Sequence, residues 1–505
     1  MIFKILDRNK RPPFNAKSKA YLTWDNWNDY YFLTLFGLIY VDENSKYHDI
    51  GSVKIGYYGQ KKSERKLSIG DSFDNIGQEY FSLGQSDSYY ETLNSLGSNI
   101  RDEILLALND IAKFPEIYDK AIHENVTKIS LLRSISQTSV IGQYHRIASG
   151  GARLTNYSFK FKNPRIRGAS EEMELTFNVN PEAFPPTNIH VLIGRNGVGK
   201  THLLNNMINT LIDGETNNKS GSFTSEITQP NSPIFANLTS VTFSAFDETE
   251  PKPERKDKTQ GIQFSYIGLR RVQSGSDKNL GPKSTIMLRN EFFKSLNTCK
   301  INATTNRWKK SIEMLESDPN FREVRIKELI DITDEEEIKS IGWSVFKKLS
   351  SGHKIVLLTI TRLIETLQER SLVLIDEPEA HLHPPLLSAF TRTLSELLFE
   401  TNSVAIIATH SPVILQEVPK SCVWKLRRTG AEAIAERLEI ESFGENVGTL
   451  TNEIFGLEVT NSGYYNMINQ AIAQTDSYEE VIQYFHNQIG MEARAIIMSL
   501  TANKN

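Results

Sequence analysis

The chain has 505 residues, which at roughly 150 residues per domain indicates about three domains or one large domain with insertions. Lysine and arginine number 57 and aspartate and glutamate 61, and the net charge of -4 excludes attachment to nucleic acid by bulk basicity. Hydrophobic residues at 39% and charged residues at 23% exclude a disordered chain and indicate a sizeable core.

The cysteine content and the N-terminus bear on the compartment. Two cysteines, Cys299 and Cys422, exclude a disulfide framework, and we expect a reducing cytoplasm. Charges interrupt residues 1–10 before a signal-peptide core can form. The apolar stretch at residues 30–41 is shorter than the ~20 residues that cross a bilayer. The sequence therefore predicts no membrane span and no membrane partner.

The first 150 residues predict an α+β extension that docks a partner. Residues 30–41 and 50–57 are apolar runs around a polar turn, which is typical of strands. Ile104, Leu105 and Leu108 recur at helical spacing.

From residue 151 onward, apolar strands alternate with helices, which predicts a parallel sheet covered on both faces. We expect its first half at residues 151–211 and its second half at 346–430. A polar helical insertion, or lid, is expected at 212–345, and a C-terminal helical segment at 431–505.

A glycine-rich turn joins an apolar strand to a helix and fits the pattern G-x-x-x-x-G-K-[ST] without deviation. Its residues are Gly194, Arg195, Asn196, Gly197, Val198, Gly199, Lys200 and Thr201, followed by His202. Glycines let successive N–H groups face one point, and the helix N-terminus adds positive potential. Lys200 would neutralise the β- and γ-phosphates, and the Thr201 hydroxyl would ligate Mg²⁺. A turn that merely caps a helix is the alternative.

Two acids and a histidine end later buried strands. Asp376 and Glu377 follow an apolar run, where Asp376 can hold Mg²⁺ through a water and Glu377 can polarise the attacking water. His410 ends the run at 404–408 and can hydrogen-bond the γ-phosphate. Each alone would be an ordinary polar residue at a strand end; their order after the glycine-rich turn favours nucleotide hydrolysis.

Ser350 and Gly352 open the helix that leads into the Asp376 strand. Ser350 can cap that helix, and its hydroxyl with the adjacent N–H groups would also make a good γ-phosphate donor.

The motifs GRNGVGKT, LSSGHK, LVLIDEPEAHLHP and IIATHS, in this order, resemble those of the ABC-type ATPases, within them the soluble branch of RecF-, SMC- and OLD-like proteins. The resemblance implies an α/β fold, a P-loop NTPase of ABC-ATPase type with a mixed central sheet, and ATP and Mg²⁺ as cofactors. It implies that Lys200, Glu377 and His410 are catalytic and that Thr201 and Asp376 hold the metal. The glycine-rich turn with His202 would hold the phosphates.

The same resemblance implies that Ser350 and Gly352 act on nucleotide held by a second subunit, and hence a homodimer or higher homo-oligomer. Ser351 and His353 stand where many relatives carry Gly and Gln, which predicts slow or partner-dependent hydrolysis. The usual Q-loop glutamine is missing, and Ser244 or Asp247 would have to replace it.

Three functions remain open. Residues 441–448 and 452–457 resemble PtuA-like ATPases of Septu- and retron-type antiphage defence, which predicts an ATPase that gates a separate HNH or Toprim nuclease. A RecF- or SMC-like DNA-repair ATPase is the alternative, with DNA contact through charges such as Lys61 and Arg270, although a solvated loop explains such charges more simply. The third is the nucleotide-binding subunit of a membrane transporter, against which the late position of Gly194 argues.

Overall fold

The computed structural model describes most of the chain. The described residues are 1–8, 10–25, 27–62, 70–151, 154–164, 172–213, 220–225, 234–243, 251–254, 262–272, 281–301, 304–332, 334–430, 432–460, 463–475 and 477–502.

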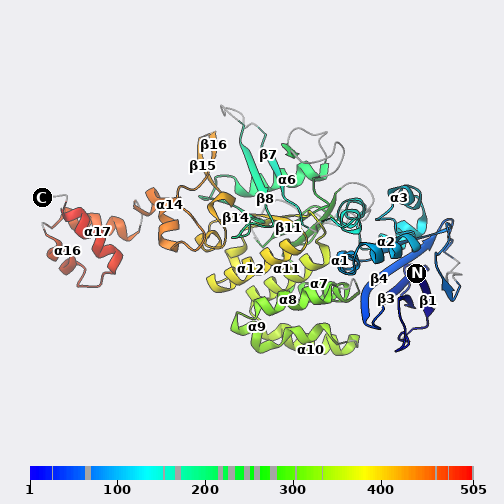
Figure 1. The fold of residues 1–505 in the computed structure, drawn as a ribbon. Helices are drawn as coiled ribbons and strands as arrows, with labels where there is room; N and C mark the ends of the chain where they lie inside the picture. The colour runs from blue at the N-terminus through cyan, green and yellow to red at the C-terminus, as the bar shows by residue number, and fades with distance from the viewer. Residues whose placement is uncertain are drawn as a thin grey trace.

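The N-terminal part is a six-stranded sheet with short helices packed on it, drawn in blue and cyan in Figure 1. The strands lie in the order β5-β1-β2-β3-β4-β6. Their bounds are β1 Ile2–Leu6, β2 Lys19–Trp24, β3 Leu35–Val41, β4 Tyr47–Tyr57, β5 Ser72–Phe73 and β6 Tyr80–Gly84. The helices are α1 Asp87–Ser95, α2 Ser98–Ala107, α3 Pro115–Ala121, η1 Thr127–Leu131, α4 Gln137–Ser139, η2 Val140–Tyr144 and α5 His145–Ala148.

A seven-stranded sheet forms the centre of the molecule, in the order β12-β11-β13-β14-β9-β15-β16. All neighbours pair in parallel except β15 and β16, which form an antiparallel hairpin. The bounds are β9 Ile189–Gly194, β11 Asn237–Thr242, β12 Gln263–Gly268, β13 Leu372–Asp376, β14 Val404–Thr409, β15 Val423–Thr429 and β16 Glu432–Glu436. The sheet is therefore mixed, as the sequence predicted.

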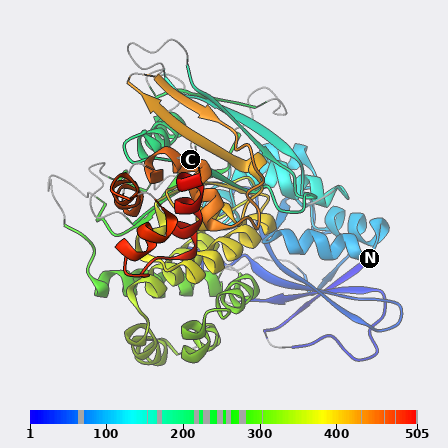
Figure 2. The same cartoon turned by 90° about the vertical axis from the view of Figure 1, so that its left-hand side faces the viewer.

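A second, antiparallel sheet joins β10 Ser222–Ser225, β7 Tyr157–Lys162 and β8 Glu174–Val179 in that order. The Trp424 indole of β15 donates to the Thr176 carbonyl of β8 at 3.2 Å, which ties this sheet to the central one. Figure 2 shows the orange β15–β16 hairpin running beside these strands.

Helices of the central part pack on the central sheet or on one another. They are α6 Lys200–Asp213, α7 Thr285–Ile301, α8 Thr305–Leu315, α9 Pro319–Val324, η3 Ile326–Ile330, α10 Glu335–Lys348, α11 Ser351–Thr366, η4 Pro378–His381, α12 Pro384–Glu400, α13 Pro412–Leu415, η5 Lys420–Cys422 and α14 Val447–Thr460. Three more follow near the C-terminus: α15 Tyr464–Ala473, α16 Tyr478–Tyr484 and α17 Met491–Ala502.

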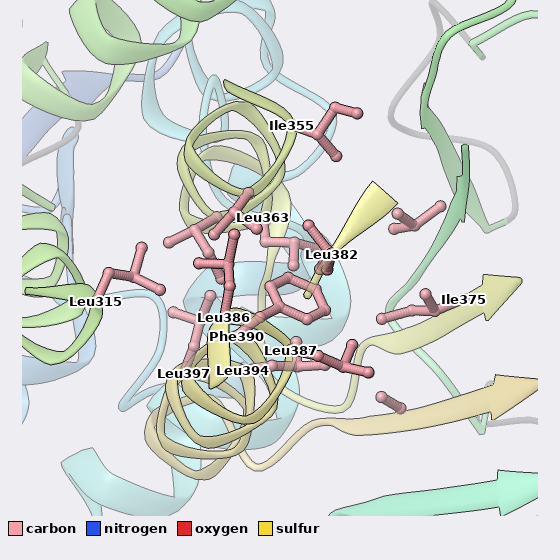
Figure 3. Packing of buried hydrophobic residues seen from close by; sticks show 14 of the residues in the cluster. Leu315, Ile355, Leu363, Ile375, Leu382, Leu386, Leu387, Phe390, Leu394 and Leu397 are labelled. Atoms are coloured by element: carbon pink, nitrogen blue, oxygen red, sulfur yellow. The ribbon is translucent and has the colours of Figure 1, made fainter. Parts of the chain in front are cut away.

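Successive side chains of the central strands point to opposite faces, so each strand serves two cores. In β13, Val373 and Ile375 join the cluster with α11 and α12, whereas Leu372 and Leu374 join the cluster with α6 and β7. Figure 3 shows the first cluster, where side chains of α11 and α12 gather against Ile375. Burial on both faces explains why these strands read as continuous apolar runs.

The expected insertion at 212–345 is only partly an insertion. β11 and β12 lie within it and belong to the central sheet, where β11 pairs with β13 and β12 pairs with β11. Apolar residues of β11, such as Leu238 and Val241, are buried on both faces of the sheet. The boundary at 211 falls inside α6, and the boundary at 430 falls inside the β15–β16 hairpin. Residues 431–505 are accordingly not all helical, since β16 completes the sheet.

The C-terminal helices α15, α16 and α17 form a small core of their own. Val481 and Ile482 are buried in it, and Tyr478, Phe485 and Ile489 pack against it. The apolar stripe that the sequence shows here is thus covered within the chain. Figure 1 places these helices at the opposite end of the molecule from the N-terminal sheet.

Both cysteines are buried as free thiols. Among the described helices, none combines the length and the apolarity that a bilayer span requires. The N-terminal part contacts the central part through an ion pair at 2.5 Å between Arg146 and the buried Glu369.

Asp110 is a fully buried carboxyl of the N-terminal part. It accepts hydrogen bonds from the N–H groups of Ala112 and Lys113 and from the Tyr90 hydroxyl, at 2.9 to 3.0 Å. Burial outweighs these bonds and raises the pKa of Asp110 from 3.8 to about 6. The folded state therefore binds this proton more tightly than the unfolded state, so the stability from this group is lost as the pH rises through about 6.

We expect Asp110→Asn, which keeps an oxygen acceptor but cannot ionise, to abolish that loss, which amounts to about 3 kcal/mol and accumulates between about pH 4 and pH 6. Hydrogen-exchange protection of β6 and α2 in the full chain, corrected for intrinsic rates, measures it. Asp102→Asn is the control, because the hydrogen bond from Arg101 lowers the pKa of Asp102 and reverses the sign. Equal pH dependence in parent and Asp110→Asn would contradict the assignment.

Candidate functional site

The strand order of the central sheet gathers the predicted site at one edge. β14 pairs in parallel with β9 on one side and with β13 on the other, with Thr409 opposite Ile193 and Ala408 opposite Asp376. The carboxyl ends of parallel strands lie at the same edge, which is where α/β proteins bind ligands. The glycine-rich turn, His410 and the two acids therefore come together, with His410 in the middle.

Lys200 lies at the centre of this edge and is 5% exposed. Its Nζ donates to the carbonyls of Gly194 and Arg195 at 3.0 and 3.1 Å and lies 2.8 Å from His410 Nε2. Burial lowers the pKa of Lys200, and the nearby carboxylates, Glu377 first among them, oppose the shift. The ammonium is thus held within the loop, beside groups of opposite charge.

Glu377 lies across His410 from Lys200. Its Oε1 is 3.1 Å from His410 Nε2, and its side chain is 38% exposed. The backbone of Glu377 is left-handed, with φ of 46°, and its N–H donates to the Ala408 carbonyl at 2.9 Å. A left-handed non-glycine residue costs about 1 kcal/mol or more and is characteristic of functional sites. The carboxylate that is expected to polarise water is therefore partly accessible and fixed by β14.

Glu379 is a site residue that the sequence analysis missed. One carboxylate oxygen accepts from the Thr409 hydroxyl at 2.7 Å and from the His410 N–H at 2.6 Å. Glu379 thereby holds the strand end that carries His410. The sequence does show a third acid two residues after Glu377, but an acid at such a position is typical of a solvated turn.

Thr201 and Asp376 line one small cavity of about 60 Å³. Asp376 is 7% exposed, and the buried Thr242 hydroxyl that also lines the cavity has no hydrogen-bond partner within the described structure. Carboxylate and hydroxyl oxygens are the ligands that Mg²⁺ prefers. The residues present fit a Mg²⁺ ion. Elsewhere in the described part of the chain, no group of three or more His, Cys, Asp or Glu side chains is arranged to hold a metal.

Backbone conformation and close packing explain why glycine occupies several positions of the turn. Gly197 and Gly199 have φ of 78° and 100°, which side-chain-bearing residues rarely adopt. A Cβ on Gly194 would lie 2.3 Å from the Leu426 carbonyl of β15. Asn196 is exposed at the tip of the turn, and Val198 is half-buried.

His202 is exposed and lines a cavity of about 280 Å³ beside the turn. Val198 and Gly199 contribute to one wall, and Arg427 and Arg428 of β15 to another. The cavity adjoins the glycine-rich turn and has room for part of a nucleotide.

The two predicted signature residues differ in solvent exposure. Ser350 caps α11, as the sequence predicted, by accepting the His353 N–H at 3.4 Å, and it is exposed together with Ser351. Gly352 is buried, and a Cβ there would meet the His381 carbonyl at 2.5 Å. Gly352 therefore packs α11 against the loop after Glu377. In the described structure, the Ser350 hydroxyl hydrogen-bonds His353 and not the Lys200 cluster.

Two expectations cannot be placed. Ser244 and Asp247, expected to replace the Q-loop glutamine, lie outside the described residues, and so does the run at 63–69 that follows Lys61. His381 and His383 make hydrogen-bond contacts within the chain. The His381 ring lies 3.2 Å from the Phe243 carbonyl, and His383 caps α12 by accepting the Leu386 N–H at 3.1 Å.

Comparison with known proteins gives the family. "Protein ea59" of Escherichia phage lambda is 40% identical over 523 residues, covering 100% of this chain and 98% of the relative. The chain belongs to the ea59 family. Residues 209–416 match the family model AAA_21, "AAA domain, putative AbiEii toxin, Type IV TA system". This match spans Ser350, both acids and His410.

Solved structures with similar segments include an ATP-binding cassette of an ABC transporter in its ADP conformation. It is 14% identical, covers 60% of this chain and 99% of its own, and has a TM-score of 0.29. A nucleotide-free ATP-binding cassette from an ABC transporter is 13% identical, covers 50% and 81%, and has a TM-score of 0.24. The α/β fold of a P-loop ATPase of ABC type, which the sequence predicted, is confirmed by the family match and the strand order.

We expect Gly352→Ala to destabilise the chain by about 1–3 kcal/mol, because its methyl group meets a backbone carbonyl that cannot rotate away. Thermal unfolding measures the change. Ser351→Ala is the matched control at the neighbouring exposed position, where the expected change is within about 0.5 kcal/mol. Equal melting temperatures for the two variants would contradict the packing role of Gly352.

Proposed function

We propose that this ATPase binds ATP·Mg²⁺, hydrolyses it, and closes into a homodimer around two nucleotides to gate a nuclease or other effector partner in antiphage defence. The observation that carries the proposal is the contact chain from Lys200 through His410 to Glu377, at 2.8 and 3.1 Å, beside a phosphate-binding turn. It supports the proposal because a cation, a polar ring and a partly exposed carboxylate lie next to one another, as the stabilisation of a γ-phosphate and the activation of its attacking water require.

In this proposal each residue of the edge has a separate task. The N–H groups of the turn and of α6 bind the β- and γ-phosphates, and Lys200 exchanges its carbonyl partners for phosphate oxygens. Glu377 accepts a proton from the attacking water, and His410 contacts the γ-phosphate. Thr201 and Asp376 hold Mg²⁺, which when bound neutralises phosphate charge.

A second copy would complete the site. Ser350 is exposed at the start of α11, and its contacts are with His353 rather than with the Lys200 cluster. A head-to-tail dimer brings this helix start onto nucleotide held by the other copy. The γ-phosphate is then the group that both halves share, so its loss on hydrolysis releases them.

The defence role rests on the family and on the resemblance to PtuA-like ATPases. A relative that matches along the full chain comes from Escherichia phage lambda, so the family occurs in a phage. We assign any cutting of nucleic acid to a separate HNH or Toprim subunit. The C-terminal helices offer it exposed apolar side chains, among them Met467, Tyr484 and Met491.

Changing Glu377 to Gln should lower the hydrolysis rate by about 100-fold or more while leaving ATP bound, because the amide cannot accept the proton of the water. Mass photometry should then show an ATP-dependent dimer. Glu116→Gln, an exposed carboxylate of α3 in the N-terminal part, is the control. Hydrolysis at the parent rate in Glu377→Gln would exclude Glu377 as the base.

Trans action can be tested by mixing two inactive variants. Lys200→Ala should abolish nucleotide binding and Ser350→Arg should block the signature, so each alone is inactive. Mixed in equal amounts with subunit exchange, half of the dimers are heterodimers with one intact site, and about one quarter of the parent activity should return. Absence of any recovery would refute a site shared between copies.

A further inference from the structure

Ser350, His353 and Asp318 form a hydrogen-bonded series at the start of α11. The Ser350 hydroxyl is 2.6 Å from His353 Nδ1, and His353 Nε2 is 3.0 Å from Asp318 Oδ1. His353 and Asp318 are 4% and 6% exposed, whereas Ser350 is exposed. The series therefore leads from the interior to the surface that is proposed to meet the second copy.

Separate segments hold the histidine. Asp318 is the N-cap of α9 in the helical insertion, where it accepts the Asn320 N–H at 2.9 Å. The Phe321 ring packs on the imidazole at 5.1 Å between centroids. His383, on the loop before α12, lies 3.6 Å from the other oxygen of Asp318. Within the described structure, Asp318 and His383 are the titratable groups that face His353 from the elements packed on it.

The direction of the hydrogen bonds follows from the carboxylate. Burial alone would raise the pKa of Asp318, but the bonds from His353 and the Asn320 amide outweigh it and leave that pKa below its ordinary value. Asp318 is thus an acceptor, and His353 Nε2 must carry a proton. In the neutral ring Nδ1 is then an acceptor, and the Ser350 hydroxyl donates a hydrogen bond to it.

A serine that donates inward to His353 has no proton left to donate to a phosphate. With a proton on both ring nitrogens, His353 donates to Asp318 and to Ser350, and the hydroxyl is free to point outward.

We propose that His353, fixed by Asp318, is a positioning residue that turns the Ser350 hydroxyl toward the partner copy's γ-phosphate when the imidazole takes up a second proton. The inference rests on the proposed function and adds to it a proton-dependent signature. It also explains what His353 changes relative to the Gln that many relatives carry at this position. A glutamine amide would donate to Ser350 at every pH, whereas the imidazole does so only when doubly protonated.

The test compares kcat and KM for ATP across pH in the parent, His353→Ala, His353→Gln and Ser350→Ala. We expect parent kcat to fall as pH rises, with KM nearly constant because the P-loop sets it. His353→Ala should hold kcat about tenfold or more below the value that the parent has at low pH, without a fall as the pH rises. His353→Gln should restore kcat and lose the fall. His145→Gln, an imidazole that contacts the Ala112 carbonyl in the N-terminal part, is the control and should behave as the parent.

The outcomes separate this inference from the proposed function. A low kcat in Ser350→Ala with parent-like behaviour in both His353 variants would overturn the inference alone. The same holds if His353→Gln keeps the parent pH profile. If the parent does not hydrolyse ATP and the Glu377→Gln variant does not dimerise in the presence of ATP, the proposed function is refuted, and the inference with it. If His353→Ala folds poorly, the pH profile of His353→Gln still tests the inference. The ATP-dependent dimerisation of the double variant His353→Gln, Glu377→Gln provides a second test.

Discussion

The pairing of β14 between β9 and β13 is the constraint on which the site depends. Backbone hydrogen bonds of three parallel strands, buried on both faces, hold their carboxyl ends at one edge. Lys200 follows one strand, His410 the next and Glu377 the third. The contacts at 2.8 and 3.1 Å that join them follow from that order. Moving β14 elsewhere in the sheet would remove His410 from between the cation and the carboxylate without changing either.

A second set of contacts links this edge to the helical insertion. Gly352 packs against the His381 carbonyl on the loop that follows Glu377, and Asp318 of the insertion reaches His353 on α11. The start of α11 is therefore supported by two segments that are distant in sequence.

Many residues of the candidate site could be predicted from the sequence because they belong to short local motifs. A glycine-rich turn between a strand and a helix, and acids that end an apolar run, report the chemistry of a few neighbouring residues. Glu379 and Asp318 were not readable. Each acts through a contact with a residue more than 30 positions away, Glu379 with His410 and Asp318 with His353, and an acid in a turn has no local feature that distinguishes it.

The amino-acid sequence by itself determined the alternation of strands and helices, the phosphate-binding turn and the identities of Lys200, Glu377 and His410, since periodicity and motif spacing are properties of the chain. Tertiary structure alone decided that β11 and β12 belong to the central sheet, that Gly352 is buried while Ser350 is exposed, and that His353 has an acid behind it. Strand order and burial arise from long-range pairing and packing, which no short window of sequence encodes.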